Sequence, residues 1–290
     1  MRRLFALLAL CLPLTLSAAE RPQVVTTFSI LADLTREIGG DDIELTNLVG
    51  ADADAHVFEP SPRDLRQILA ADLLIANGLG FEPWLERLWA SGEARGRRLD
   101  ASAGVPPLQV EEDGQRIADP HAWQSLGNAE RYAHNIARAL SEIDPDNAAD
   151  YAARRDAWLA QLHALRAEIA PRLAALPAEH RRVLTSHDAF GYFAREWNLQ
   201  FRAAQGVSDA AEPSAAEIAA LIRQLREEQV RALLVENIRD PRLIEQIAAE
   251  AGARVGSTLY SDALAAGGPA SRYLGMYRQN VERLLEVLEP

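Results

Sequence analysis

The sequence has a single cysteine, Cys11, which lies in the apolar N-terminal stretch MRRLFALLALCLPLTLSAAE. Two arginines precede the apolar run and small residues end it, a pattern typical of a cleaved secretory signal peptide over residues 1–19. A lipid-modified cysteine would follow a small residue, and Leu10 is not small, so we do not expect lipidation. The mature chain then has no thiol, which excludes disulfides and thiolate metal ligands.

Long apolar runs and a basic charge balance are also missing. No later stretch approaches the ~18 apolar residues of a transmembrane helix, so we expect an exported, soluble product of about 270 residues. The net charge is -12, and removal of Arg2 and Arg3 makes it more negative. This balance argues against a nucleic-acid partner. It is compatible with a cationic ligand, although solubility alone accounts for much of it.

Short β-rich stretches alternate with helical patterns in both halves of the chain. In the first half, residues 23–30 (QVVTTFSI) and 43–50 (IELTNLVG) have the composition of strands. A helix is expected after them, with Ser61 as its N-cap and Pro62 at its first position. The second half repeats the alternation, from RRVLTSHDAF to LYSDAL. The sequence therefore predicts an α/β protein of two lobes with largely parallel sheets.

One long helical pattern connects the two halves. Asp144 fits its N-cap and Pro145 its first turn, and a kink is expected at Pro171. About 30 helical residues would span roughly 45 Å, so we expect a stiff linker and not a flexible hinge. Its apolar face comprises Tyr151, Trp158, Leu162, Leu165, Ile169, Leu173 and Leu176, and its solvated face Arg154, Arg155 and Arg166. The predicted first lobe, linker helix and second lobe cover residues 20–143, 144–177 and 178–290.

Three of the six histidines, His56, His121 and His187, fall in loops or at strand ends. Open α/β sheets bind their ligands at the carboxyl ends of strands. Acidic residues close in sequence could accept the second ring N–H of each imidazole, as is usual for metal ligands. These acids are Asp54, Glu59, Asp119 and Asp188. The remaining histidines, His134, His163 and His180, are interpreted as structural.

Asp262, in the loop after ARVGSTLY, is the fourth candidate ligand. Three imidazoles and one carboxylate would complete the tetrahedral shell that zinc prefers. Spacing alone favours a helix cap or turn role for Asp262. Glu236, at the end of ALLVEN, is a further carboxylate that we assign to support of the site or to structure.

Several segments, in order, resemble the zinc- and manganese-binding solute-binding proteins of ABC importers, the cluster A-I family. HVFEPSPRDL is similar to its H-x-Y-E-P-[ST]-P-x-D-L segment, and ADPHAW to its D-P-H-x-W motif. SHDAFGYFAREWNLQ, EPSAAEI, IAAEAG and LYSDAL match further segments, so the resemblance covers nearly all of the mature chain.

The resemblance implies two (β/α) lobes joined by one long rigid helix, with a metal site in the cleft between them. It carries the ligands over to His56, His121, His187 and Asp262. It also implies a periplasmic binding protein that delivers Zn²⁺ to an inner-membrane ABC permease, is a monomer and not an enzyme, and has a metallochaperone as a possible second partner. Family members specific for manganese tend to have glutamate at the third ligand, so His187 favours zinc.

The chain departs from the family pattern at three places. Ala55 replaces the proline before the first ligand, and Phe58 replaces a tyrosine. The stretch VPPLQVEEDGQRIADP is short and has no histidine, whereas many zinc-binding members have a long His-rich loop there. This chain is therefore expected to be the type without a His-rich loop.

Other functions remain open at the level of sequence. A manganese- or iron-binding protein of the same importer class is the main alternative, and an adhesin has no direct support. A secreted zinc hydrolase would use metal-bound hydroxide, but the sequence has no H-E-x-x-H helix. Trp123 is a candidate for shielding the metal from water. Phe190 and Tyr192 are expected to pack beside the site.

Overall fold

The computed structural model describes residues 20–91, 93–112, 114–207, 214–228, 230 and 232–289. The proposed signal peptide and Cys11 lie outside these residues. The strands are β1 (Gln23–Phe28), β2 (Glu44–Val49), β3 (Leu73–Ala76), β4 (Arg97–Asp100), β5 (Gln109–Glu112), β6 (Gln115–Ala118), β7 (Arg182–His187), β8 (Gln200–Gln205), β9 (Ala232–Leu233) and β10 (Arg254–Val255). The helices are α1 (Ser29–Gly39), α2 (Pro62–Ala70), α3 (Pro83–Ala90), α4 (Leu126–Ile143), α5 (Ala148–Ala174), α6 (Gly191–Trp197), α7 (Ala215–Glu227), α8 (Arg242–Ala251) and α9 (Tyr273–Leu288). Short 3₁₀ turns include η2 (Ala122–Gln124) and η3 (Pro145–Asn147).

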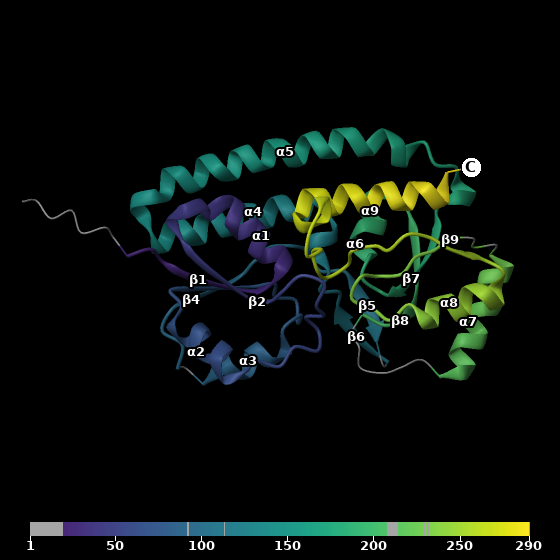
Figure 1. The fold of residues 1–290 in the computed structure, drawn as a ribbon, viewed down its shortest axis with the longest axis horizontal. Helices are drawn as coiled ribbons and strands as arrows, with labels where there is room; N and C mark the ends of the chain where they lie inside the picture. Colours follow the sequence, from purple (N-terminus) through teal and green to yellow (C-terminus); the bar gives the residue numbers. More distant parts are fainter. Residues whose placement is uncertain are drawn as a thin grey trace, which may run out of the picture.

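Two parallel sheets organise the chain into two lobes (Figure 1). The first lobe has the strand order β2-β1-β3-β4, with Gln23 of β1 opposite Glu44 of β2 and Val24 opposite Leu73 of β3. The second lobe has the order β10-β9-β7-β8, and β7 pairs in parallel with β8. The antiparallel hairpin β5-β6 forms a separate small sheet. The predicted α/β class with parallel sheets in two lobes is confirmed.

Local sequence signals account for several helix starts. Ser61 caps α2, its hydroxyl accepting from the Asp64 backbone N–H while the Asp64 side chain accepts from the Ser61 N–H, and Pro62 occupies the first position. The predicted cap of α2 is therefore confirmed. Ser214 and Glu217 form the same reciprocal box at the start of α7.

The long helix α5 runs along one side of the molecule past both lobes (Figure 1). It packs against α4 and α1 of the first lobe and against α9 and α6 of the second. The seven apolar residues predicted for its inner face, from Tyr151 to Leu176, are all buried. One buried cluster continues from Phe28 to Leu288, so the apolar core does not stop at the boundary between the lobes.

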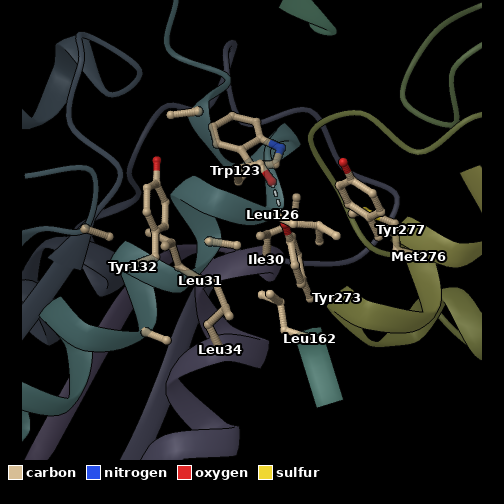
Figure 2. Packing of buried hydrophobic residues seen from close by; sticks show 14 of the residues in the cluster. Ile30, Leu31, Leu34, Trp123, Leu126, Tyr132, Leu162, Tyr273, Met276 and Tyr277 are labelled. Carbon is tan, nitrogen blue, oxygen red and sulfur yellow. Dashed lines mark hydrogen bonds between the residues drawn. The ribbon is translucent and has the colours of Figure 1, made fainter. Parts of the chain in front are cut away.

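The centre of this core lies where α1, α4, α5 and α9 meet. Figure 2 shows Leu31 and Leu34 of α1 near Leu162 of α5, with Tyr273 of α9 close by. The Tyr273 hydroxyl donates to the Trp123 carbonyl at 2.6 Å. Burying several large side chains in one cluster makes a sliding of the lobes costly, because each buried aromatic or aliphatic side chain contributes about 1.5–3 kcal/mol.

Two expectations about the linker helix are wrong. Helix α5 is shorter at both ends than the predicted 144–177. It begins after the 3₁₀ turn η3, and it ends at Ala174. Asp144 does not cap α5; its carboxylate accepts from the Tyr151 hydroxyl at 2.7 Å. Arg154 lies on the partly exposed face of the helix, as predicted, and its Nε also donates to the Ile38 carbonyl at 2.8 Å. Arg166 likewise pairs with Glu196 of α6 at 2.7 Å.

Among the described residues, no helix is both long enough and apolar enough to cross a membrane.

Candidate metal centre

The structure brings the four predicted ligands, His56, His121, His187 and Asp262, together between the two lobes. One nitrogen or oxygen atom from each lies within 4.8 Å of the others. His56 is in the loop after β2, His121 immediately precedes η2, His187 is the last residue of β7, and Asp262 follows β10. As the sequence suggested, His187 lies at a strand end and His56 lies in the loop after a strand.

The other histidines stay apart from this cluster. His134 is exposed. His163 lies 3.3 Å from Glu130 on the helix surface. His180 contacts the Leu288 carbonyl at 2.8 Å. These contacts agree with their interpretation as structural residues.

Four of the distances among these groups are close to the edge of a tetrahedron around a metal ion. The Nε2 atoms of His56 and His121 are 3.2 Å apart. Asp262 Oδ2 lies 3.2 Å from His56 Nε2 and 3.1 Å from His187 Nε2, and Oδ1 lies 3.6 Å from His121 Nε2. Four ligands at about 2.0–2.1 Å from a central ion are about 3.3 Å from one another. The group is therefore arranged to share one cation.

Burial makes this group of ionisable residues depend on a compensating charge. Both Asp262 oxygens are buried, with no hydrogen-bond partner among the described residues. Burial opposes ionisation of Asp262, but the imidazoles of His187 and His121 outweigh it and hold its pKa well below the usual range. A buried, ionised carboxylate is stable only beside a cation. The donor set of three imidazoles and this carboxylate therefore fits a divalent metal.

His56 of the first lobe and His187 of the second lobe differ in their protonation. Burial lowers the pKa of His56, which keeps its ring neutral and able to bind a metal near neutral pH. Burial would also lower the pKa of His187, but the carboxylates of Glu236 and Asp262 outweigh it and raise the pKa to about 10. In the metal-free protein His187 therefore holds a proton in a position that a metal would take.

Carboxylates orient two of the imidazoles from behind. Asp119 Oδ1 lies 2.8 Å from His121 Nδ1, as its place in the sequence suggested. Glu236 Oε2 lies 2.5 Å from His187 Nδ1, and Oε1 accepts from the His187 backbone N–H at 2.9 Å. The Tyr192 hydroxyl donates to the Asp119 carbonyl at 3.0 Å, which fixes this support in place. Such partners set the ring orientation and raise the basicity of a metal ligand.

Three of the acids that adjoin the histidines in sequence have other roles. The Asp188 backbone N–H donates to Gly206, and Glu236, not Asp188, contacts the His187 ring. Asp54 accepts from the backbone N–H of His56 at 2.8 Å. Glu59 is exposed. Proximity in sequence therefore identified the ring partner of His121 alone.

Aromatic rings cover the first-lobe side of the cluster. The Trp123 ring lies 5.3 Å from that of His121, and Trp123 is fully buried, so it shields this ligand as expected. Phe81, in the loop after β3, lies 4.7 Å from the His56 ring and 4.9 Å from Trp123. Sequence analysis missed Phe81, although Phe81 follows a short apolar stretch of the sequence as His56 does. Phe190 is buried and stacks on Phe201, and Tyr192 supports Asp119 as described above.

Comparison with known proteins agrees with this fold. The family described as "Zinc-uptake complex component A periplasmic" matches residues 24–287. The periplasmic zinc binding protein TroA from Treponema pallidum superimposes with a TM-score of 0.88 at 28% identity, over 93% of this chain and 100% of that one.

Curated relatives of similar length carry different metal names. The iron-binding protein YfeA of Yersinia pestis is 31% identical over 268 residues, 92% of this chain and 86% of that protein. The manganese ABC transporter substrate-binding lipoprotein PsaA of Streptococcus pneumoniae is 32% identical over 282 residues, 94% of this chain and 90% of that protein.

The chain belongs to this family of metal-binding periplasmic substrate-binding proteins of ABC transporters. These are binding proteins, so the expectation that the chain is not an enzyme is confirmed. Several relatives are named as lipoproteins. The expectation that Cys11 carries no lipid concerns residues outside the described ranges and stays a prediction.

Proposed function

We propose that this protein binds Zn²⁺ through His56, His121, His187 and Asp262 and delivers it to an ABC permease of the inner membrane. The observation that carries the proposal is the meeting of three imidazole Nε2 atoms and one buried carboxylate at tetrahedral spacing. Four side-chain ligands fill a tetrahedral shell and leave no position for an activated water. The site thus suits capture and transfer of an ion, not hydrolysis.

Zinc is favoured over manganese and iron by the donor atoms. Imidazole suits zinc, whereas oxygen-rich shells suit manganese. His187 supplies a nitrogen at the position where manganese-specific family members tend to have glutamate. The relatives' names divide among zinc, manganese and iron, so they support a transition-metal cargo without choosing one.

The lobes and the long helix suggest how the ion is held. Residues 20–143 and 178–290 act as the two lobes, and the linker segment 144–177, which contains α5, limits their relative motion to a small tilt. The continuous core under α5 supports this proposal. Delivery takes place in the periplasm, where the monomeric protein meets the permease; a metallochaperone is a possible source of the ion.

A competitive metal titration tests the proposal. Metal-free mature protein is titrated with Zn²⁺ against a chelator and then with Mn²⁺, for the wild type, Asp262→Ala and His187→Ala. The exposed His163→Ala serves as the matched control. We expect one tight zinc per chain, much weaker manganese, and losses in the two site variants larger than the about 10–100-fold typical of residues that only orient a ligand.

Equal or stronger binding of manganese would contradict the choice of zinc while leaving metal transport intact. Unchanged zinc affinity in Asp262→Ala would show that the ion sits elsewhere. No stoichiometric metal in the wild type would refute the proposed function as a whole.

A further inference from the structure

Three of the four proposed ligands are held by buried contacts, and those beside His121 and Asp262 join the lobes. Trp123 Nε1 and Gln124 Nε2 both donate to the Ser261 carbonyl, at 2.9 and 2.7 Å. These two residues follow His121, and Ser261 directly precedes Asp262. His187 lies in a sheet and is fixed by Glu236 at its ring and its backbone. His121, His187 and Asp262 therefore form a trio in place before any metal binds.

His56 is held differently. Its loop, residues 50–61, contains no helix or strand. Its side chain is 7% exposed, whereas the side chains of the other three proposed ligands are fully buried. The next residue, Val57, is 62% exposed, so the outer face of the loop meets solvent. Of the four proposed ligands, His56 is the one that can move away from the other three without breaking the core.

Polar contacts to the second lobe fix this loop in its place. Asp54 uses Oδ1 to accept the His56 backbone N–H at 2.8 Å and Oδ2 to accept Arg239 at 2.9 Å. Asp52 accepts Asn237 Nδ2 and the Ala266 N–H, both at 2.9 Å.

These contacts hold the loop in the position in which His56 faces the other three proposed ligands. Asp52 adopts a positive φ of 52°, in the left-handed region that aspartate tolerates better than most residues. Arg239 and Asp54 are 10% and 14% exposed, so water screens their attraction only weakly. An outward swing of the loop would break the contact with Arg239, because one carboxylate joins Arg239 to the His56 backbone.

We propose that Asp52, Asp54, Asn237 and Arg239 form a latch that holds His56 over the other three ligands and sets the rate of metal release. The inference rests on the proposed function, because it takes His56 as a ligand. Release requires His56 to leave the ion, and the latch adds its own contacts to that step. The four are positioning residues, since none of them belongs to the ligand set.

Stopped-flow measurement of zinc release into excess chelator tests the latch. Arg239→Gln removes the charge, and Asp54→Asn removes the charge while keeping an oxygen for the His56 N–H. A hydrogen bond to a charged group corresponds to a change of about 10- to 100-fold, so each variant should release zinc faster by that factor. The double variant should release zinc no faster than the quicker single one, because the two changes remove the same contact.

Arg242→Gln is the matched control, because Arg242 lies three residues further along, at the start of α8, and pairs with the exposed Asp240. It should release zinc at the wild-type rate. The latch variants should still bind one zinc per chain with an undiminished association rate, which a general loss of structure would not allow. Arg239→Lys keeps the charge and should recover part of the slow release.

Two results would overturn the latch. Wild-type release rates in Arg239→Gln and Asp54→Asn would refute it while leaving zinc binding intact. Additive effects in the double variant would show that the residues act separately. If the wild type binds no zinc, the proposed function fails, and the latch fails with it.

Discussion

Zinc should displace a proton from His187 when it binds. In the metal-free protein, the pKa of His187 is raised to about 10, with the carboxylates of Glu236 and Asp262 outweighing the effect of burial. The protonated ring cannot bind a metal, so below pH 10 the ion must first expel this proton. Because the competing proton is lost as pH rises, zinc affinity should increase from pH 7 toward pH 10.

The size of this competition follows from the pKa. The pKa of His187 lies well above 7, so the proton competes with zinc throughout the range from pH 7 toward pH 10. Affinity should therefore rise about tenfold per pH unit in this range, and His187 should release about one proton per zinc. His56 adds none near neutral pH, because burial lowers its pKa.

Glu236→Gln separates the two roles of the carboxylate. The variant loses the charge and one of the two carboxylate oxygens that contact His187, which should weaken zinc binding by about 10–100-fold. It also lowers the pKa of His187, so the proton competes less. The two effects oppose each other at low pH, and only the first remains at high pH. The zinc affinity of Glu236→Gln should therefore increase less steeply with pH than that of the wild type. The difference in affinity between the two proteins should grow between about pH 6.5 and 8.5.

Chelator competition at several pH values, with titration calorimetry in buffers of different ionisation enthalpy, measures both quantities. The surface variant Glu130→Gln serves as the control, because Glu130 lies beside the exposed His163, 3.3 Å from its ring. A wild-type affinity that does not change with pH, with no proton released, would refute the reasoning about His187. A deficit of Glu236→Gln that is largest at low pH would refute the division of roles.

Two predictions concern the stability of the fold. Glu82 is buried, and burial raises its pKa from 4.5 to about 7, so stability present below pH 4.5 is lost as pH rises through about 7. Urea unfolding should show that the free energy of unfolding falls by about 3 kcal/mol over this pH range. Glu82→Gln should reduce this pH dependence. A wild type whose free energy of unfolding does not fall would contradict the assignment. Arg154→Ala removes the contacts of α5 with the Ile38 carbonyl and Asp42 and should lower the free energy of unfolding by about 1–2 kcal/mol. Arg155→Ala, the control, removes a contact with the neighbouring exposed Asp156 and should change it by less than about 0.5 kcal/mol. Equal effects of the two variants would contradict the anchoring role.

Much of the fold and the ligand set could be predicted from local sequence. Ser61 and Pro62 mark a helix start through short-range capping that needs no tertiary information. His187 was recognised because the end of a parallel strand is a fixed place in such a fold. Asp262 was ambiguous on spacing, since a carboxylate after a strand serves equally as a cap. The resemblance to a family resolved that choice.

The remaining contacts depend on which segments meet in space. Glu236 reaches His187 because it follows β9, the strand next to β7, and no local pattern distinguishes it from Asp188. Arg154 was assigned to the solvated face because its spacing on α5 is right for that face. It is anchored because α1 ends where its side chain reaches. The contact between Asp54 and Arg239 joins residues far apart in sequence, and such contacts leave no periodic signal.

The most direct test of the central claim is X-ray absorption at the zinc edge of protein loaded with one zinc per chain. The account predicts four nitrogen or oxygen ligands at about 2.0–2.1 Å, with the scattering pattern of three imidazoles, and loss of one imidazole in His187→Ala. A shell of five or six ligands, or one with fewer than three imidazoles in the wild type, would contradict it.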